Sequence, residues 1–110
     1  MLRTIPRLTA TLAAAALCGA IAAPAAAQSP PAELGRNLAA TCANCHGTGG
    51  VSVGGTVSLA GTPKADLVAK MQDFKAGRRT GTIMPQLAKG YTDPQIEALS
   101  AWFAAQKAPQ

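Results

Sequence analysis

The chain has few of the residues from which small proteins usually build a core or a catalytic centre. It holds one histidine, three cysteines and only four aromatic side chains (two Phe, one Tyr and one Trp) in 110 residues. A single histidine excludes a bis-histidine metal site made by this chain alone. No pattern typical of a β-strand is present. We therefore expect an all-α protein whose small core is completed by something other than its own side chains.

Long hydrophobic runs are also scarce, and the only one lies near the N-terminus. Arg3 and Arg7 precede an apolar run over residues 8–23, and small residues follow at 25–27, the order that is typical of a secretory signal peptide. We expect cleavage after Ala27, a mature domain of residues 28–110, and a location in the periplasm. The alternative is an uncleaved anchor, but the run is shorter than the ~20 residues that span a bilayer. We expect no stable membrane insertion after cleavage.

Cleavage changes the counts of cysteine and charge. It removes Cys18 and leaves Cys42 and Cys45, so no odd thiol remains in an exported protein. The full chain has ten Lys and Arg against five Asp and Glu; without Arg3 and Arg7 the balance is eight against five, or +3. The basic residues concentrate between positions 64 and 89. They predict either a docking face for an acidic partner or an ordinary solvated helix face, whereas nucleic-acid binding is not expected.

Three helices and two loops are predicted along the mature chain. Helical periodicity indicates helices at 32–44, 63–76 and from Thr92 to about 106, with core stripes through Leu34 and Leu38, Leu67, Met71 and Phe74, and Ile96, Leu99 and Phe103. Gly77 is expected to end the second helix, and Thr92 and Gln95 fit a capping box at the start of the third. The stretches 47–61 and 78–90 are predicted loops. The first has six glycines but lacks the Gly-Lys-Ser/Thr ending of a phosphate-binding loop.

The chemistry of the chain is concentrated in the pentapeptide 42–46. Cys42, Cys45 and His46 form C-x-x-C-H, the attachment signature of a c-type haem. Two residues between the thiols match the spacing of the two vinyl groups on one porphyrin edge, and the following histidine is carried beneath the iron. A thioredoxin-like site lacks its βαβ frame, a zinc site would lack ligands, and a disulfide would close too small a loop to stabilise much. We expect one covalent haem c with His46 as an iron ligand.

The sixth iron ligand has to come from another residue type or remain absent. Met84 lies in the predicted loop before the last helix, where Pro85 restricts the backbone, and is the expected ligand. Met71 lies on a helical apolar stripe, where methionine usually fills a core. Coordination by His46 and Met84 favours one-electron transfer and leaves no site for a substrate, so we do not expect an enzyme.

These motifs resemble class I cytochromes c over nearly the whole mature chain. The resemblance rests on Gly35 and Arg36 before C-x-x-C-H, the glycine-rich loop with Ser58-Leu-Ala-Gly61, Ile83-Met-Pro85 and the aromatic last helix. It implies a helical fold wrapped around haem, in which the first and last helices cross with Gly35 near Trp102 and Phe103.

A narrower resemblance concerns residues 67–78 and 88–93. Both segments are similar to the cytochrome subunit of flavocytochrome c sulfide dehydrogenase, in which a flavoprotein oxidises sulfide and passes electrons to the haem. The resemblance implies a flavoprotein redox partner. A free-standing soluble electron shuttle is the alternative, and an open-site haem enzyme or gas sensor would require Met84 not to bind iron.

Overall fold

The computed structural model describes residues 31–110. The predicted signal peptide of residues 1–27, its cleavage site and Cys18 lie outside the described residues. Within residues 31–110 the regular elements are all helical and no strand is present, which confirms the all-α fold. No helix in this range is long and apolar enough to cross a membrane.

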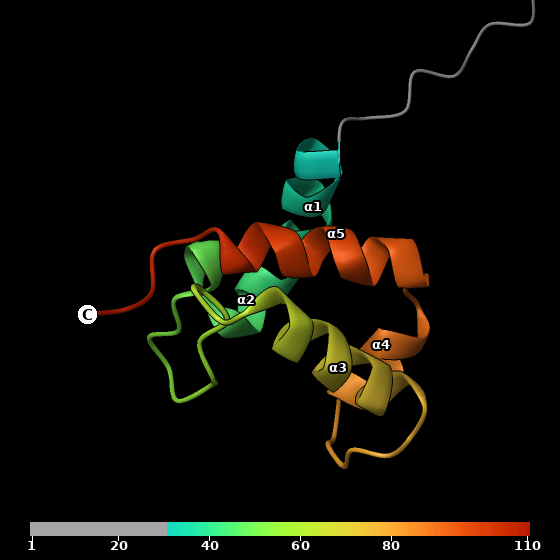
Figure 1. Ribbon diagram of the computed structural model, residues 1–110. Coiled ribbons are helices and arrows are strands. Elements are labelled where there is room, and N and C mark those ends of the chain that lie inside the picture. The colour runs from blue at the N-terminus through green and yellow to red at the C-terminus, as the bar shows by residue number, and fades with distance from the viewer. Residues whose placement is uncertain (1–30) are drawn as a thin grey trace, which may run out of the picture.

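Helices and short 3-10 turns follow one another along the described chain (Figure 1). In order they are α1 (Pro31–Ala39), η1 (Ala40–Cys42), α2 (Ala43–His46), η2 (Thr48–Gly50), α3 (Lys64–Lys75), α4 (Met84–Lys89) and α5 (Asp93–Ala104). The three predicted helices are confirmed. The first is longer than expected, because η1 and α2 continue α1 as far as His46.

The ends of the two long helices follow the predicted local signals. Thr92 caps α5, with its side chain accepting from the Gln95 N–H and the Gln95 side chain accepting from the Thr92 N–H, so the capping box is present. Gly77 follows α3 with a φ of 72°, the left-handed conformation that ends a helix at least cost in glycine.

Helices α1 and α5 cross at a contact that depends on a missing side chain. A Cβ atom at Gly35 would collide with the Ala98 carbonyl oxygen and lie 3.1 Å from Trp102 Cβ. The two backbones can therefore approach closely only because position 35 is glycine. The expected contact of Gly35 with the Trp102 region is confirmed, and Ala98 lies closer still.

The buried face of α1 differs from the predicted stripe by one position. Gly35 and Ala39 are its buried residues, whereas Leu34 and Leu38 are only half-buried. Leu38 still packs against the core, but the fully buried positions are the small residues beside the leucines, because the close crossing leaves no room for larger ones there.

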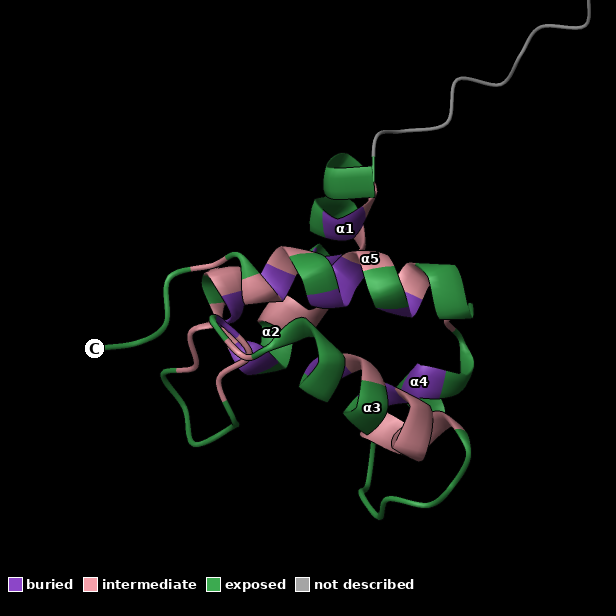
Figure 2. Cartoon of the chain, in the orientation of Figure 1, coloured by how far each residue is buried: buried purple, intermediate pink, exposed green. Residues whose placement is uncertain are grey.

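The core consists of two hydrophobic clusters, and α5 contributes residues to both. Figure 2 shows buried positions along α5. The first contains Ala39, Leu67, Leu99 and Phe103. The second contains Met71, Ala88 and Ile96. Tyr91 packs against both, and its hydroxyl lies 2.9 Å from Thr41 Oγ1. Tyr91 thus joins the segment that carries the haem-binding motif to the start of α5.

The second predicted loop, 78–90, is only partly irregular. Its second half forms α4, so the prediction of a continuous loop was wrong there. Pro85 lies in the first turn of this helix, where its missing N–H leaves no intrahelical bond unmade. Helix α4 is six residues long, which is too short for hydrophobic periodicity to reveal it.

Candidate functional site

The cysteine–histidine motif lies on one continuous turn of right-handed helix. Cys42 ends η1, and Cys45 and His46 end α2; Cys42 and Ala43 both have right-handed helical dihedral angles, so the turn is unbroken. Residues three and four positions apart share a helix face. Cys42 is therefore a neighbour of both Cys45, three positions on, and His46, four positions on.

Gly47 ends this segment in a conformation that other residues avoid. Its φ is 82° and its ψ is 159°, and an added Cβ atom would collide with the Val51 carbonyl oxygen. The chain turns sharply there and returns through the loop 51–61, which comes back beside His46.

The imidazole of His46 is buried and has one specific partner. Only 8 % of the residue is exposed, and its Nδ1 lies 2.7 Å from the carbonyl oxygen of Val57. A carbonyl oxygen can only accept, so Nδ1 carries the proton and donates it. In that tautomer Nε2 keeps its lone pair, which is the form of histidine that binds a metal.

The Val57 contact was missed by sequence reasoning, and no sequence signal could have found it. A backbone oxygen is available at every residue, so which one reaches His46 depends on the path of the loop. The resemblance to class I cytochromes did include Ser58 to Gly61, the residues that directly follow. The resemblance implies no role for these four residues.

The two cysteines have different environments. Cys42 is half-buried and packs against the first core cluster, whereas Cys45 is exposed. Burial raises the pKa of the Cys42 thiol, and a hydrogen bond with Thr41 opposes this in part. Both are free thiols in the structure, so the alternative of a disulfide is not observed.

The structure brings no further zinc ligand to the cysteine–histidine motif. Among residues 31–110, no three His, Cys, Asp or Glu side chains lie together in a way that could hold a metal ion. The motif supplies two sulfurs and one imidazole, which is one fewer than the four ligands of a structural zinc site.

The two candidate methionines lie in the same part of the core but differ in exposure. Met71 is 9 % exposed and belongs to the second cluster, as expected for a core methionine. Met84 is half-buried at the start of α4 and packs on the edge of that cluster. Figure 1 shows α2 and α4 on the same side of α5. Met84 is therefore the less buried of the two methionines.

Several large apolar residues are exposed to solvent in the polypeptide without a bound cofactor. Val57, whose carbonyl faces His46, is 66 % exposed, Ile83, directly before Met84, is 56 % exposed, and Leu87, about one helical turn after Met84, is 48 % exposed. Together with the free Nε2 and the two free thiols, they fit a flat apolar group such as haem.

The basic stretch between residues 64 and 89 is partly neutralised. Three of its six cations form ion pairs: Lys64 with Glu97 at 2.6 Å, Lys75 with Asp93 at 2.7 Å, and Arg78 with Asp73 at 2.8 Å. The guanidinium of Arg79 lies 5.3 Å from the ring centre of Phe74. This pairing favours the solvated-face interpretation over a dedicated basic docking face.

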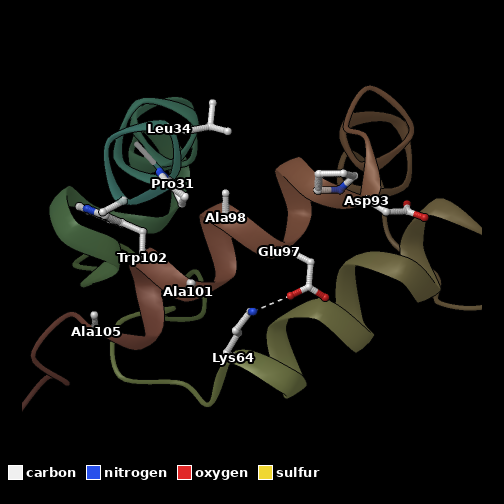
Figure 3. Close-up of a pocket in the computed structure, with 11 residues that line it drawn as sticks. Pro31, Leu34, Lys64, Asp93, Glu97, Ala98, Ala101, Trp102 and Ala105 are labelled. Carbon is white, nitrogen blue, oxygen red and sulfur yellow. Dashed lines mark ion pairs between the residues drawn. The ribbon is translucent and has the colours of Figure 1, made fainter. Parts of the chain in front are cut away.

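A shallow groove lies on the outer side of the crossing between α1 and α5 (Figure 3). Leu34 of α1 and Ala98, Ala101 and Trp102 of α5 line it, and the Lys64–Glu97 ion pair lies at its edge. It contains none of the cysteine, histidine or methionine residues considered above.

Known proteins resemble this chain in sequence over most of its length. The sequence profile of the cytochrome c family matches residues 32–107. The cytochrome subunit of sulfide dehydrogenase from Chlorobaculum tepidum is 38 % identical over 94 % of this chain and 93 % of its own length. The thiosulfate dehydrogenase electron acceptor of Thiomonas intermedia is 35 % identical over 86 % of this chain, and cytochrome c4 of Pseudomonas aeruginosa is 36 % identical over 69 %.

The coverage of these relatives differs. The chain spans 43 % of the Thiomonas protein and 38 % of the Pseudomonas protein, less than half of each. It spans nearly all of the Chlorobaculum subunit. The family match and the C-x-x-C-H motif agree on the cofactor, and the relatives are named as electron acceptors, subunits or cytochromes. This chain therefore belongs to the cytochrome c family, and it is an electron-transfer protein that binds haem c covalently.

Proposed function

We propose that the chain is a periplasmic one-electron acceptor for a sulfur-oxidising flavoprotein. Cys42 and Cys45 hold the haem through thioether bonds, and His46 and Met84 bind the iron. The observation that carries the electron-transfer role is the arrangement of His46: a buried imidazole, held through Nδ1 by Val57 and on the same helical turn as two free thiols.

Each residue has a defined part in this site. The haem supplies one-electron chemistry, because its iron alternates between the ferric and ferrous states. Val57 fixes the ring of His46 and makes its Nε2 a stronger donor. The thioether of Met84 favours the ferrous state and thereby raises the reduction potential. With both residues bound, the iron would have no open position for a substrate, so the site would transfer electrons and not transform a substrate.

The nature of the partner is proposed from the closely matching subunit. That relative is named as the cytochrome subunit of sulfide dehydrogenase, and this chain covers nearly its whole length. A second relative is named as the electron acceptor of thiosulfate dehydrogenase. Both names concern inorganic sulfur oxidation, which favours a sulfur-oxidising donor over a general respiratory role.

The axial ligands can be tested by visible spectroscopy of the purified protein. Coordination by Met84 predicts a methionine–iron charge-transfer band in the oxidised form and slow binding of CO to the reduced form. Rapid CO binding to the native reduced protein would instead support an open-site haem enzyme or gas sensor.

The partner can be tested by reduction kinetics with an exported flavoprotein from the same host. Oxidised cytochrome is mixed without oxygen with sulfide alone, with flavoprotein alone, and with both. We expect rapid haem reduction only when both are present. Equal rates with and without the flavoprotein would leave the free-standing electron shuttle as the better description.

A further inference from the structure

The loop 51–58 contains Val57, the residue whose carbonyl faces His46. Backbone hydrogen bonds hold the two ends of this loop, whereas few contacts hold its tip, residues 53–57. At the base, the N–H groups of Leu59 and Ala60 both donate to the Gly50 carbonyl oxygen, at 2.7 and 3.0 Å. Gly50 is held in turn against Phe103, because an added Cβ atom would lie 2.7 Å from that ring. The arms of the loop are therefore anchored to the core immediately before residue 51 and after residue 58.

The tip has little to hold it. Val53 is 97 % exposed and Val57 66 % exposed. Among residues 31–110, no backbone–backbone hydrogen bond reaches residues 53–57. The hydrogen bond from His46 to the carbonyl oxygen of Val57 thus depends on a peptide group at the end of a weakly held segment.

The side chain of Ser58 links the two ends of this loop, next to the Val57–Ser58 peptide group. The Ser58 hydroxyl oxygen accepts the Ser52 N–H at 2.9 Å and so ties the two arms together across the loop. Ser58 supplies the nitrogen of the peptide group whose oxygen faces His46. The side chain of Ser52 takes no part in this bond, and its own hydroxyl makes only a 3.5 Å contact with the Gly54 N–H.

We propose that Ser58 is a positioning residue that sets the strength of the His46–Val57 hydrogen bond and, through it, the reduction potential of the haem iron. This inference rests on the proposed function, since it requires His46 to bind iron. A stronger bond from Nδ1–H to a carbonyl makes the imidazole a better electron donor. A better donor stabilises ferric iron, so the loop holds the potential lower than a loose loop would.

The test compares variants at position 58 in the complete haem-loaded protein. Ser58→Ala removes the hydroxyl, while Ser58→Val and Ser58→Thr have nearly the same shape and differ in whether the hydroxyl is kept. Ser52→Ala is the matched control, because it leaves the backbone N–H that Ser58 accepts. For each protein we would measure the midpoint potential, the solvent exchange of the His46 Nδ1 proton by NMR, and the methionine–iron band.

We expect Ser58→Ala and Ser58→Val to raise the midpoint potential and to speed exchange of the Nδ1 proton roughly fivefold or more. Ser58→Thr and Ser52→Ala should resemble the parent protein, and the methionine–iron band should persist throughout. The inference is overturned if Ser58→Val and Ser58→Thr behave alike, if Ser52→Ala gives the same shift, or if the potential changes only with loss of the methionine–iron band.

A failure of the proposed function would be visible separately, in the parent protein. If His46 binds iron, the reduced parent shows His46 ring protons strongly shifted by the porphyrin ring current. Their absence would refute iron binding by His46, whereas normal shifts with no effect of Ser58 would refute only the role of Ser58.

Discussion

At the residue scale, the site depends on side chains and on backbone groups, and only the side chains can be predicted from a sequence. Cys42, Cys45 and His46 were predicted because their side-chain chemistry and spacing are specific. The carbonyl of Val57 was not, because its role comes from the loop path and not from its side chain. Gly47 lies between these cases: the sequence places it in a predicted glycine-rich loop, but only the structure gives the collision with Val51 that requires glycine.

The proposed ligand Met84 gives the first prediction at this scale. Met84→His should lower the midpoint potential while haem stays attached, because an imidazole stabilises ferric iron more than a thioether does. The measurement is a redox titration followed by visible absorption, with Met71→Leu as the control, since Met71 is buried in the core. A Met84→His protein with the parent potential would assign the sixth position to another ligand.

At the element scale, the long helices were predictable and the short ones were not. Helices α3 and α5 each extend over twelve residues, enough for their apolar period and end signals to be read. Helix α4 spans six residues and was expected to be loop. On α1 the fully buried residues are Gly35 and Ala39, each one position after a leucine, because the close helix crossing admits only small residues there.

The crossing itself predicts the effect of adding one methyl group. Gly35→Ala should lower the free energy of unfolding by about 1–3 kcal/mol, although alanine is the better helix former, because the new Cβ would collide with Ala98. Denaturant unfolding of the haem-loaded protein measures this. Gly54→Ala is the control, since nothing lies within 4 Å of its added Cβ atom. A Gly35→Ala protein as stable as the parent would show that the helices are not in close contact.

The ion pair between Lys75 of α3 and Asp93 of α5 predicts that the stability of the folded protein depends on pH. A hydrogen bond from Lys75, aided by Gln72, holds the pKa of Asp93 below its ordinary value. A lowered folded-state pKa gives stability that is present above the unfolded-state pKa and is lost as the pH falls through the folded-state value. Asp93→Asn should therefore lose less stability between neutral pH and about pH 3 than the parent does. The effect should be small because Asp93 is exposed.

Thermal unfolding across that pH range measures the difference. Asp66→Asn is a matched control: Asp66 also lies in the first turn of a helix, and no ion pair is found for it among residues 31–110. If both variants follow the same pH curve as the parent, the Lys75–Asp93 pair makes no contribution.

At the scale of the whole molecule, charge is distributed unevenly around the motif. No Lys, Arg, Asp or Glu occurs from Asn37 to Pro63, the stretch that includes both cysteines, His46 and the glycine-rich loop. The cations lie mainly on α3 and in the segment that follows it, and half of those between residues 64 and 89 are paired with acids. The local excess of positive charge was predictable from the sequence, but its partial neutralisation depends on which helices meet.

This distribution predicts weak electrostatic steering toward a redox partner. The rate of haem reduction by the partner should fall less than about threefold as ionic strength rises from about 0.01 to 0.15 M. Stopped-flow reduction at several salt concentrations measures it. A fall of about tenfold or more, reduced by Lys70→Gln or Lys89→Gln, would instead establish a basic docking face.

The most direct test of the whole account is the attachment of haem to Cys42 and Cys45. The purified mature protein should have the mass of its polypeptide plus one haem, and its colour should stay with the protein in acidified organic solvent. The double variant Cys42→Ala, Cys45→Ala should lose both properties. A parent protein that is colourless, or whose pigment is extracted by the solvent, would contradict the account.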